Sequence, residues 1–297
     1  MTWQRKGEYM TIIDMRSRPP FGRYADQWVF NVEDSEKGMG LARKFANMDI
    51  PMPDSILHKS MQHYLREMDE AGIQKAVVPL RKSATLDNGD LLSLLNAWPD
   101  RFIGFIGVRP MADPMEQILR EIDDLIVNGP CHGVIMEPGI DPVPWKMDDE
   151  RVFPVYEKCE QEGIPLNILL GGVFHRPDAP DSGYYSPLLA EHVARVFPKL
   201  HILLSHAGWP WTVAACAAAI NWDNIWLAPD SYLINHPGAQ DYVVGANYRL
   251  QDKFLFGSTY PASPMQYTVD QCRVLIRQEV QEKFFYRNAE AFLNIQL

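Results

Sequence analysis

The sequence predicts an α/β fold, a single-domain (β/α)8 TIM barrel over residues 1–297. Short apolar runs alternate with helical patterns along the chain, eight such units fit into fewer than 300 residues, and the strands are too apolar to face water on either side. This alternation implies a parallel sheet with helices outside it, and eight units close into a barrel. A doubly wound open sheet is the alternative, but no glycine-rich phosphate motif follows an early strand.

The first four strands are predicted at residues 11–15, 75–80, 102–108 and 133–136. Apolar spacing predicts helices at 41–48, 55–71 (capped by Gly72), 91–98 and 151–162. A further helix should begin with a capping box at Asp113, Pro114 and Glu116, and run to Asn128. The connection at 19–54 is long for a compact domain, so we expect it to be a lid over the barrel mouth.

The other four strands are predicted at 165–170, 201–205, 224–227 and 253–256. The helices that follow them are expected to open at Ser186, near 210 and near 240, and at Ser263, and a last helical segment at 281–294 ends the chain. No linker composition interrupts this series. The sequence therefore predicts one domain with 19–54 as its only insertion.

Composition excludes several classes of function. The formal net charge is -10, so a broad contact with nucleic acid or with an anionic membrane is not expected. The first ten residues have no apolar core like that of a signal peptide, and no apolar run approaches the ~18 residues of a membrane span. Four scattered cysteines without metal-type spacing are typical of a reducing compartment, so we expect a cytoplasmic protein.

Polar side chains follow every predicted strand at its C-terminal end, where barrels of this kind build their sites. In strand order they are Arg16 and Arg18; Arg81; Arg109; Glu137; His175; His206 and Trp209; Asp230 and Tyr232; and Thr259. Arginines from three strands would then meet at one rim of an acidic protein. Their convergence predicts a mouth that binds a small anion.

Arg16 and Arg18 alternate with Asp14, so the three side chains should share one face of the strand end. Two neighbouring cations are costly unless an anion meets them. The alternative is a solvated loop in which each arginine pairs with a nearby carboxylate. In the same way, a lone histidine such as His206 is often a hydrogen-bonded structural residue, and aromatic side chains beside it are often ordinary packing.

Four stretches carry a family pattern: Asp-Met-Arg-Ser-Arg at 14–18, Ser-His-Ala-Gly at 205–208, Phe-Gly-Ser-Thr-Tyr-Pro at 256–261 and Asn-Ala-Glu-Ala-Phe-Leu at 288–293. Together they resemble the amidohydrolase superfamily, in the amidohydrolase 2 branch of lactonases, muconate-type decarboxylases and related hydrolases. In that branch the corresponding stretches are Asp-x-His-x-His, a sixth-strand histidine motif, Gly-Ser-Asp-x-Pro and a terminal Asn-Ala helix. The resemblance covers the whole chain.

The departures from this pattern concern the metal. The resemblance implies metal-binding histidines on the first strand and an aspartate on the eighth, but this sequence has Arg16, Arg18 and Thr259 at those positions. The fifth-strand histidine has no counterpart either. A guanidinium group has only donors and no lone pair for a cation. We therefore expect a divergent member with no metal and no other cofactor, in which two positive charges replace a metal ion.

The leading hypothesis is a metal-independent hydrolase acting on a small carboxylated lactone, ester or amide, as the resemblance implies. Arg16 and Arg18 would bind the carboxylate or a developing oxyanion, and His206 would be the general acid or base. Glu137 or Asp230 would orient His206 or titrate as the second group. The remaining substrate contacts would come from Arg81, Arg109, His175, Trp209, Tyr232 and Thr259.

Two other functions stay open. One is a decarboxylase or isomerase of the same branch, with the arginines as an electron sink. The other is a non-catalytic barrel that binds a carboxylate, because a fold does not fix a function. The sequence names neither the substrate nor the oligomeric state.

Overall fold

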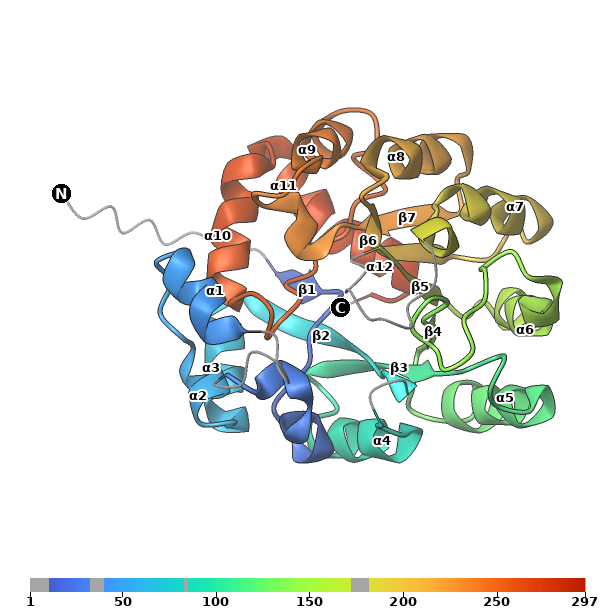
Figure 1. The fold of residues 1–297 in the computed structure, drawn as a ribbon, viewed down its shortest axis with the longest axis horizontal. Helices are drawn as coiled ribbons and strands as arrows, with labels where there is room; N and C mark the ends of the chain where they lie inside the picture. The colour runs from blue at the N-terminus through green and yellow to red at the C-terminus, as the bar shows by residue number, and fades with distance from the viewer. Residues whose placement is uncertain (1–10, 33–39, 83–84, 172–181, 297) are drawn as a thin grey trace.

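The computed structural model describes residues 11–32, 40–82, 85–171 and 182–296 (Figure 1). Its parallel strands lie in chain order, each paired with the next. They are β1 (Ile12–Asp14), β2 (Ile73–Pro79), β3 (Phe102–Gly107), β4 (Gly133–Met136), β5 (Leu166–Gly171), β6 (Ile202–Trp209) and β7 (Ile225–Ala228). The predicted α/β barrel is confirmed, and the chain forms a single domain.

The eighth predicted strand, 253–256, holds the last position in the ring but is reduced to one β-bridge, between Leu227 and Phe254. On one side Leu255 N donates to Leu227 O at 2.9 Å, and on the other Met15 N donates to Phe256 O at 2.9 Å. These bonds join β7 to β1 and close the barrel. The segment is not a full strand because Phe256 N turns away from the sheet and donates to Phe284 O at 3.1 Å.

Helices surround the ring of strands, as Figure 1 shows. They are α1 (Leu41–Asn47), α2 (Asp54–Leu57), α3 (Met61–Ala71), α4 (Asn88–Ala97), α5 (Met115–Ile122), α6 (Phe153–Glu162), α7 (Leu188–Val196), α8 (Thr212–Asn221), α9 (Ala239–Asn247), α10 (Met265–Leu275) and α11 (Gln278–Glu282). A single-turn π-helix, η4 (Asp123–Val127), prolongs α5, and another, η8 (Lys283–Arg287), joins α11 to α12 (Asn288–Leu293). In the part of the chain that the structure describes, no helix is both long and apolar enough to cross a bilayer.

Two sequence predictions about helices were wrong. The helix expected at 55–71 is broken into α2 and α3, because Lys59 takes a positive φ of 47° and Ser60 begins a new helix by accepting a hydrogen bond from His63 N. The capping box at Asp113 does not form, since Asp113 pairs with Arg109 instead and the N-cap residue of α5 is Pro114. In both places another local contact replaced the one that the sequence pattern predicted.

The core has two parts. An outer layer packs the strands against the surrounding helices, and an inner cluster fills the barrel axis with Ile13, Val77, Phe105, Ile135, Leu203 and Leu255. α12 lies across the N-terminal end of the barrel and contributes Ala289, Phe292 and Leu293 to the inner cluster. The barrel is therefore closed at this end, and its C-terminal end remains for a site.

The described parts of 19–54 include α1 and two short 3-10 turns, η1 (Gly22–Asp26) and η2 (Trp28–Phe30), and end at the first residue of α2. They contribute Tyr24, Val29, Phe30, Leu41 and Phe45 to the outer core layer. Figure 1 shows η1 and η2 in dark blue, beside α4. Residues 33–39 of the expected lid lie outside the described residues, and the lid stays a prediction.

Candidate active site

Arg16 is buried at the C-terminal end of the barrel, with only 1% of its surface exposed. The chain bends after β1, and Arg16 N donates to Asp14 Oδ1 at 3.0 Å. The nearest carboxylate to the guanidinium is Asp230, with Oδ2 3.7 Å from Nε. This ion pair is too long for a hydrogen bond. Arg16 Nε, Nη1 and Nη2 have no hydrogen-bond partner among the described residues, and burial lowers the pKa of this guanidinium.

Arg18 follows Arg16 on the same segment and is half-buried. Its Nε is enclosed and has no hydrogen-bond partner among the residues that the structure describes. Burial lowers the pKa of Arg18 well below its usual value, and the neighbouring charges of Arg81 and Arg16 lower it further. A narrow cavity beside Arg18 and Arg81 is walled by Gln27, Trp28 and Val29. The segment after β1 therefore forms one side of the site.

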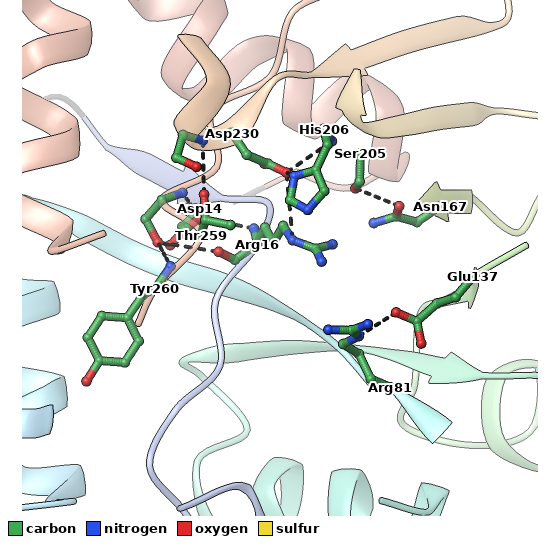
Figure 2. Close-up of polar contacts among 12 residues, drawn as sticks. Asp14, Arg16, Arg81, Glu137, Asn167, Ser205, His206, Asp230, Thr259 and Tyr260 are labelled. Carbon is green, nitrogen blue, oxygen red and sulfur yellow. Dashed lines mark hydrogen bonds and ion pairs between the residues drawn. The ribbon is translucent and has the colours of Figure 1, made fainter. Parts of the chain in front are cut away.

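Arg81, at the end of β2, is paired. Its Nε donates to Glu137 Oε1 from the end of β4, and both side chains are buried. Figure 2 shows that the pair faces Arg16 across the site. Glu137, predicted as a catalytic group, is placed here as the counter-ion of Arg81.

His206 and Asp230 meet at the ends of β6 and β7. His206 Nδ1 lies 2.8 Å from Asp230 Oδ2, and His206 N donates to the same oxygen at 3.2 Å. Both residues have positive φ values, 60° and 58°. Gly257 makes room for this arrangement, because a Cβ at that position would overlap Asp230 Oδ1. Strained backbone of this kind is typical of functional sites.

The protonation state of His206 follows from its surroundings. Burial lowers the pKa of the imidazole to about 4, the charge of Arg16 lowers it as well, and Asp230 acts in the opposite direction. The ring is therefore neutral at pH 7. With Asp230 beside Nδ1, the hydrogen belongs on Nδ1 and the lone pair on Nε2. His206 is thus placed to accept a proton at Nε2.

Asp14 does not share a face with the arginine head groups, contrary to the prediction from alternation. Its Oδ1 accepts from Ser258 N at 2.8 Å, and its Oδ2 accepts from Ser258 Oγ at 2.5 Å. The strand rule fails because the chain bends at Arg16 and Asp14 joins β1 to the closing segment. Burial raises the pKa of the Asp14 carboxyl to about 7. Asp14 holds the barrel together beneath the site.

Aromatic rings flank His206. The Tyr232 ring meets the imidazole edge-on with centroids 5.1 Å apart, and Trp209 stacks on Tyr232 at 4.9 Å. Burial raises the pKa of the Tyr232 hydroxyl to about 12, so it stays protonated at neutral pH. The two rings form one wall beside the proposed proton acceptor.

The remaining predicted residues are placed differently. Arg109 forms a two-bond pair with Asp113 at the start of α5 and is partly exposed. Thr259 Oγ1 accepts from Ser231 N at 3.0 Å, which ties down η7 (Asp230–Leu233). His175 lies outside the described residues. Arg109 and Thr259 are thus occupied by structural contacts.

Sequence reasoning missed a buried polar pair on β5 and β6. Ser205 Oγ donates to Asn167 Oδ1 at 2.7 Å, and neither residue is exposed. Both lie inside apolar strands, so they did not appear among the residues that follow a strand. The available signal was a single amide in the run Leu166-Asn167-Ile168-Leu169.

A metal site is what the family pattern implies at this end of the barrel. In the described ranges no three His, Cys, Asp or Glu side chains come together as metal ligands do. The positions after β1 present guanidinium donors in place of lone pairs. The described residues therefore do not fit a divalent metal ion.

Comparisons with known proteins agree with the fold. A family model described as Amidohydrolase matches residues 56–295. An uncharacterised TIM-barrel protein from Bordetella bronchiseptica is 30% identical, with 96% of this chain and 98% of that chain covered and a TM-score of 0.84. Comparison with curated proteins gave no match.

More distant solved structures share the fold. A dihydroxybenzoic acid decarboxylase from Polaromonas sp. JS666, with bound manganese and 2-nitroresorcinol, is 16% identical over 96% of both chains, with a TM-score of 0.67. A 4-oxalomesaconate hydratase from Rhodopseudomonas palustris is 17% identical over 95% of both chains, with a TM-score of 0.60.

Proposed function

Because the chain belongs to the amidohydrolase family, we propose that it is an enzyme that hydrolyses a small carboxylated lactone, ester or amide without a metal ion. The observation that carries the proposal is the buried Arg16 guanidinium, none of whose nitrogens has a hydrogen-bond partner among the described residues. A buried charge without hydrogen bonds is costly. An anionic ligand would remove that cost, which supports a carboxylate as the group bound at this position.

The charge balance suggests what kind of anion. Three guanidinium groups face the site, those of Arg16, Arg18 and Arg81, and two carboxylates compensate them, those of Asp230 and Glu137. His206 is neutral at pH 7. The described part of the site therefore has an excess of one positive charge. A ligand that brings one carboxylate would balance it.

The mechanism follows from these positions. Arg18 would hold the substrate carboxylate, and Arg16 would donate to the carbonyl oxygen as negative charge develops on it. His206 Nε2 would take a proton from the attacking water and return it to the leaving alcohol or amine. Because the charge of Arg16 contributes to the low pKa of His206, a bound anion would raise that pKa and make the imidazole a better base.

Exchange of both arginines tests the proposal. Arg16→Lys and Arg18→Lys keep the charge but lose the planar fork, and Arg16→Met and Arg18→Met lose both. Each methionine variant should weaken carboxylate binding by about 2–4 kcal/mol, and each lysine variant by a smaller but clear amount. Calorimetric titration with a panel of small mono- and dicarboxylates measures this. Stability should not fall in step with affinity in Arg16→Met, because the relief of crowded cations offsets the loss of the contact with Asp230.

Arg109→Met is the matched control, because this arginine already has a carboxylate partner in Asp113. It should leave carboxylate affinity unchanged. If all four site variants bind like the parent protein but unfold several degrees earlier, Arg16 and Arg18 are structural and the site lies elsewhere.

Metal independence has its own test. Protein purified without chelator should hold no stoichiometric transition metal by elemental analysis, because guanidinium groups replace the ligand set after β1. About one zinc or manganese ion per chain, removed only with loss of function, would contradict the proposal.

Decarboxylation is the second candidate. The solved relatives include a dihydroxybenzoic acid decarboxylase and a 5-carboxyvanillate decarboxylase from Sphingomonas paucimobilis, 16% identical, with 97% of this chain and 100% of that chain covered and a TM-score of 0.66. The flat wall of Trp209 and Tyr232 beside His206 favours an aromatic acid. Product analysis separates the two reactions, since decarboxylation releases carbon dioxide and adds a proton to the same carbon, whereas hydrolysis adds water. Binding without any turnover would indicate a non-catalytic barrel.

A further inference from the structure

We infer that Asn167 contacts the substrate, with its Nδ2 donating to the same anionic group that Arg16 binds. This inference rests on the proposed carboxylate-binding function and adds a second donor from the opposite side of the barrel. It also makes the floor of the site selective for oxygen atoms that only accept hydrogen bonds.

The orientation of the amide is set by its neighbour. Ser205 Oγ donates to Asn167 Oδ1 at 2.7 Å, so Oδ1 is turned toward β6. Asn167 is fully buried, and its Nδ2 has no hydrogen-bond partner among residues that the structure describes. Leaving a buried amide donor unpaired is unfavourable. The arrangement is therefore built around an acceptor that the described chain does not itself provide.

The Asn167 side chain points into the barrel, toward its axis. Asn167 is paired between Ile135 on β4 and Leu203 on β6, both members of the inner cluster. In Figure 2 its Nδ2 points toward the guanidinium of Arg16, with His206 above and Arg81 below. Two buried groups with unpaired donors, Asn167 and Arg16, thus face one space from opposite walls.

The chemistry of these donors defines the ligand group. N–H groups without hydrogen-bond partners among the described residues converge on the space from Asn167 and Arg16. An ammonium group there would bring donors against donors, and a hydroxyl group would add a donor of its own. A carboxylate oxygen, which only accepts, satisfies donors on both sides. The floor of the site therefore selects a carboxylate over an alcohol or amine of the same size.

The test is Asn167→Asp, which keeps the shape and still accepts from Ser205 but turns a carboxylate toward Arg16, whose guanidinium nitrogens have no hydrogen-bond partner among the described residues. The carboxylate introduced by this exchange would take the place of the substrate carboxylate in the empty protein. The empty variant should melt several degrees above the parent protein at pH 7. The gain should disappear as the pH falls and the new carboxyl is protonated, because it is present only while that group is ionised. A melting temperature equal to or below that of the parent would overturn the inference.

Asn224→Asp is the matched control. Asn224 is a buried asparagine whose Nδ2 already donates to Ala194 O at 3.2 Å and to Phe197 O at 2.8 Å. A carboxylate there would face two carbonyl oxygens, so this variant should melt lower than the parent. The two exchanges have the same chemistry, and only the first turns the new carboxylate toward a guanidinium that lacks hydrogen bonds within the described chain.

Titration with benzoate separates this inference from the proposed function. If the parent protein binds benzoate, Asn167→Asp should lose that affinity at least tenfold. If the parent does not bind benzoate or any other carboxylate while Asn167→Asp still raises the melting temperature, the placement of Asn167 against Arg16 is right and the proposed substrate class is wrong.

Discussion

The two ends of the barrel differ in whether their enclosed polar groups have hydrogen-bond partners. At the N-terminal end, His132 and His201 precede β4 and β6, and their ring nitrogens lie 2.6 Å from Leu293 O and 2.9 Å from Phe292 O. At the C-terminal end, Arg16 and Asn167 have buried nitrogens with no hydrogen-bond partner among the described residues.

The difference has a structural cause. The last turn of a helix leaves carbonyl oxygens without intrahelical partners, and α12 presents two of them to histidines at the closed end. The helix is thereby fixed across the barrel, and the contacts serve stability. The open end has no such helix over it in the described chain, and its donors converge on a central space instead. In barrels of this type stability is concentrated at the first end and function at the second.

The largest expected effect tests the charge balance of the open end. Asp230→Asn keeps the size and tolerates the positive φ, but it removes the carboxylate that both Arg16 and His206 face. Breaking a buried ion pair by removing one partner costs about 3–5 kcal/mol. We therefore expect this loss in the free energy of unfolding by denaturant titration.

Its control is Asp252→Asn. Asp252 forms an exposed ion pair with Lys283 at 2.7 Å, with 73% of the aspartate side chain accessible. An exposed pair of this kind contributes about 0–1 kcal/mol. Equal losses for the two variants would show that the charges at the open end are as well solvated as those on the surface.

The next effect is the pH dependence of stability. The pKa of His206 is lowered to about 4 in the folded protein, so between that value and its usual 6.5 the unfolded chain binds a proton that the folded chain does not. Stability from this group is therefore lost as the pH falls through that window, on the order of 3 kcal/mol in full. His206→Gln should remove this slope. Unfolding titrations at pH 7.5 and pH 5 measure it.

The carboxyl of Asp14 should change the pH dependence of stability in the opposite direction. Its pKa is raised to about 7, so the folded chain holds a proton between pH 4 and 7 that the unfolded chain releases, and stability is lost as the pH rises through that window. Compared with the parent protein, Asp14→Asn should therefore be relatively more stable at pH 7.5 than at pH 5. The two variants should change the pH slope in opposite directions. A change in the same direction for both would contradict a neutral His206 and a protonated Asp14 in the folded protein.

Local sequence patterns predicted most of the fold. The strand at 133–136 was placed to the residue, because a short apolar run between glycine and proline signals needs no tertiary information. The break at Lys59 and the loss of the capping box at Asp113 came from competing local contacts, the cap at Ser60 and the pair with Arg109, which the pattern of apolar residues does not reveal. The eighth strand was predicted as a strand, but its hydrogen bonds go partly to Phe284.

The grouping of charged side chains at the C-terminal end was also predictable in part, whereas their roles stay predictions. Six charged or titratable residues were selected because each follows a predicted strand, and the structure brings them together. They are Arg16, Arg18, Arg81, Glu137, His206 and Asp230. The same rule could not show that the Arg109 guanidinium pairs with Asp113, four positions later on the chain, and so does not join the other arginines. It also could not find Asn167, because alternation inside a buried strand does not reveal which polar side chain faces the barrel axis.

The smallest expected effect tests the closed end. His201→Leu removes the ring nitrogen that meets Phe292 O and leaves that part-buried carbonyl without its partner. Such a loss costs about 1–3 kcal/mol, partly offset because leucine keeps apolar contact with Trp226, whose ring centroid lies 4.7 Å from that of the imidazole. Carboxylate affinity should stay within about twofold, since the change is at the opposite end from Arg16. Denaturant unfolding and calorimetric titration of the same variant measure both quantities. A loss of affinity as large as the loss of stability would mean that α12 also controls the open end, and that the two ends are coupled.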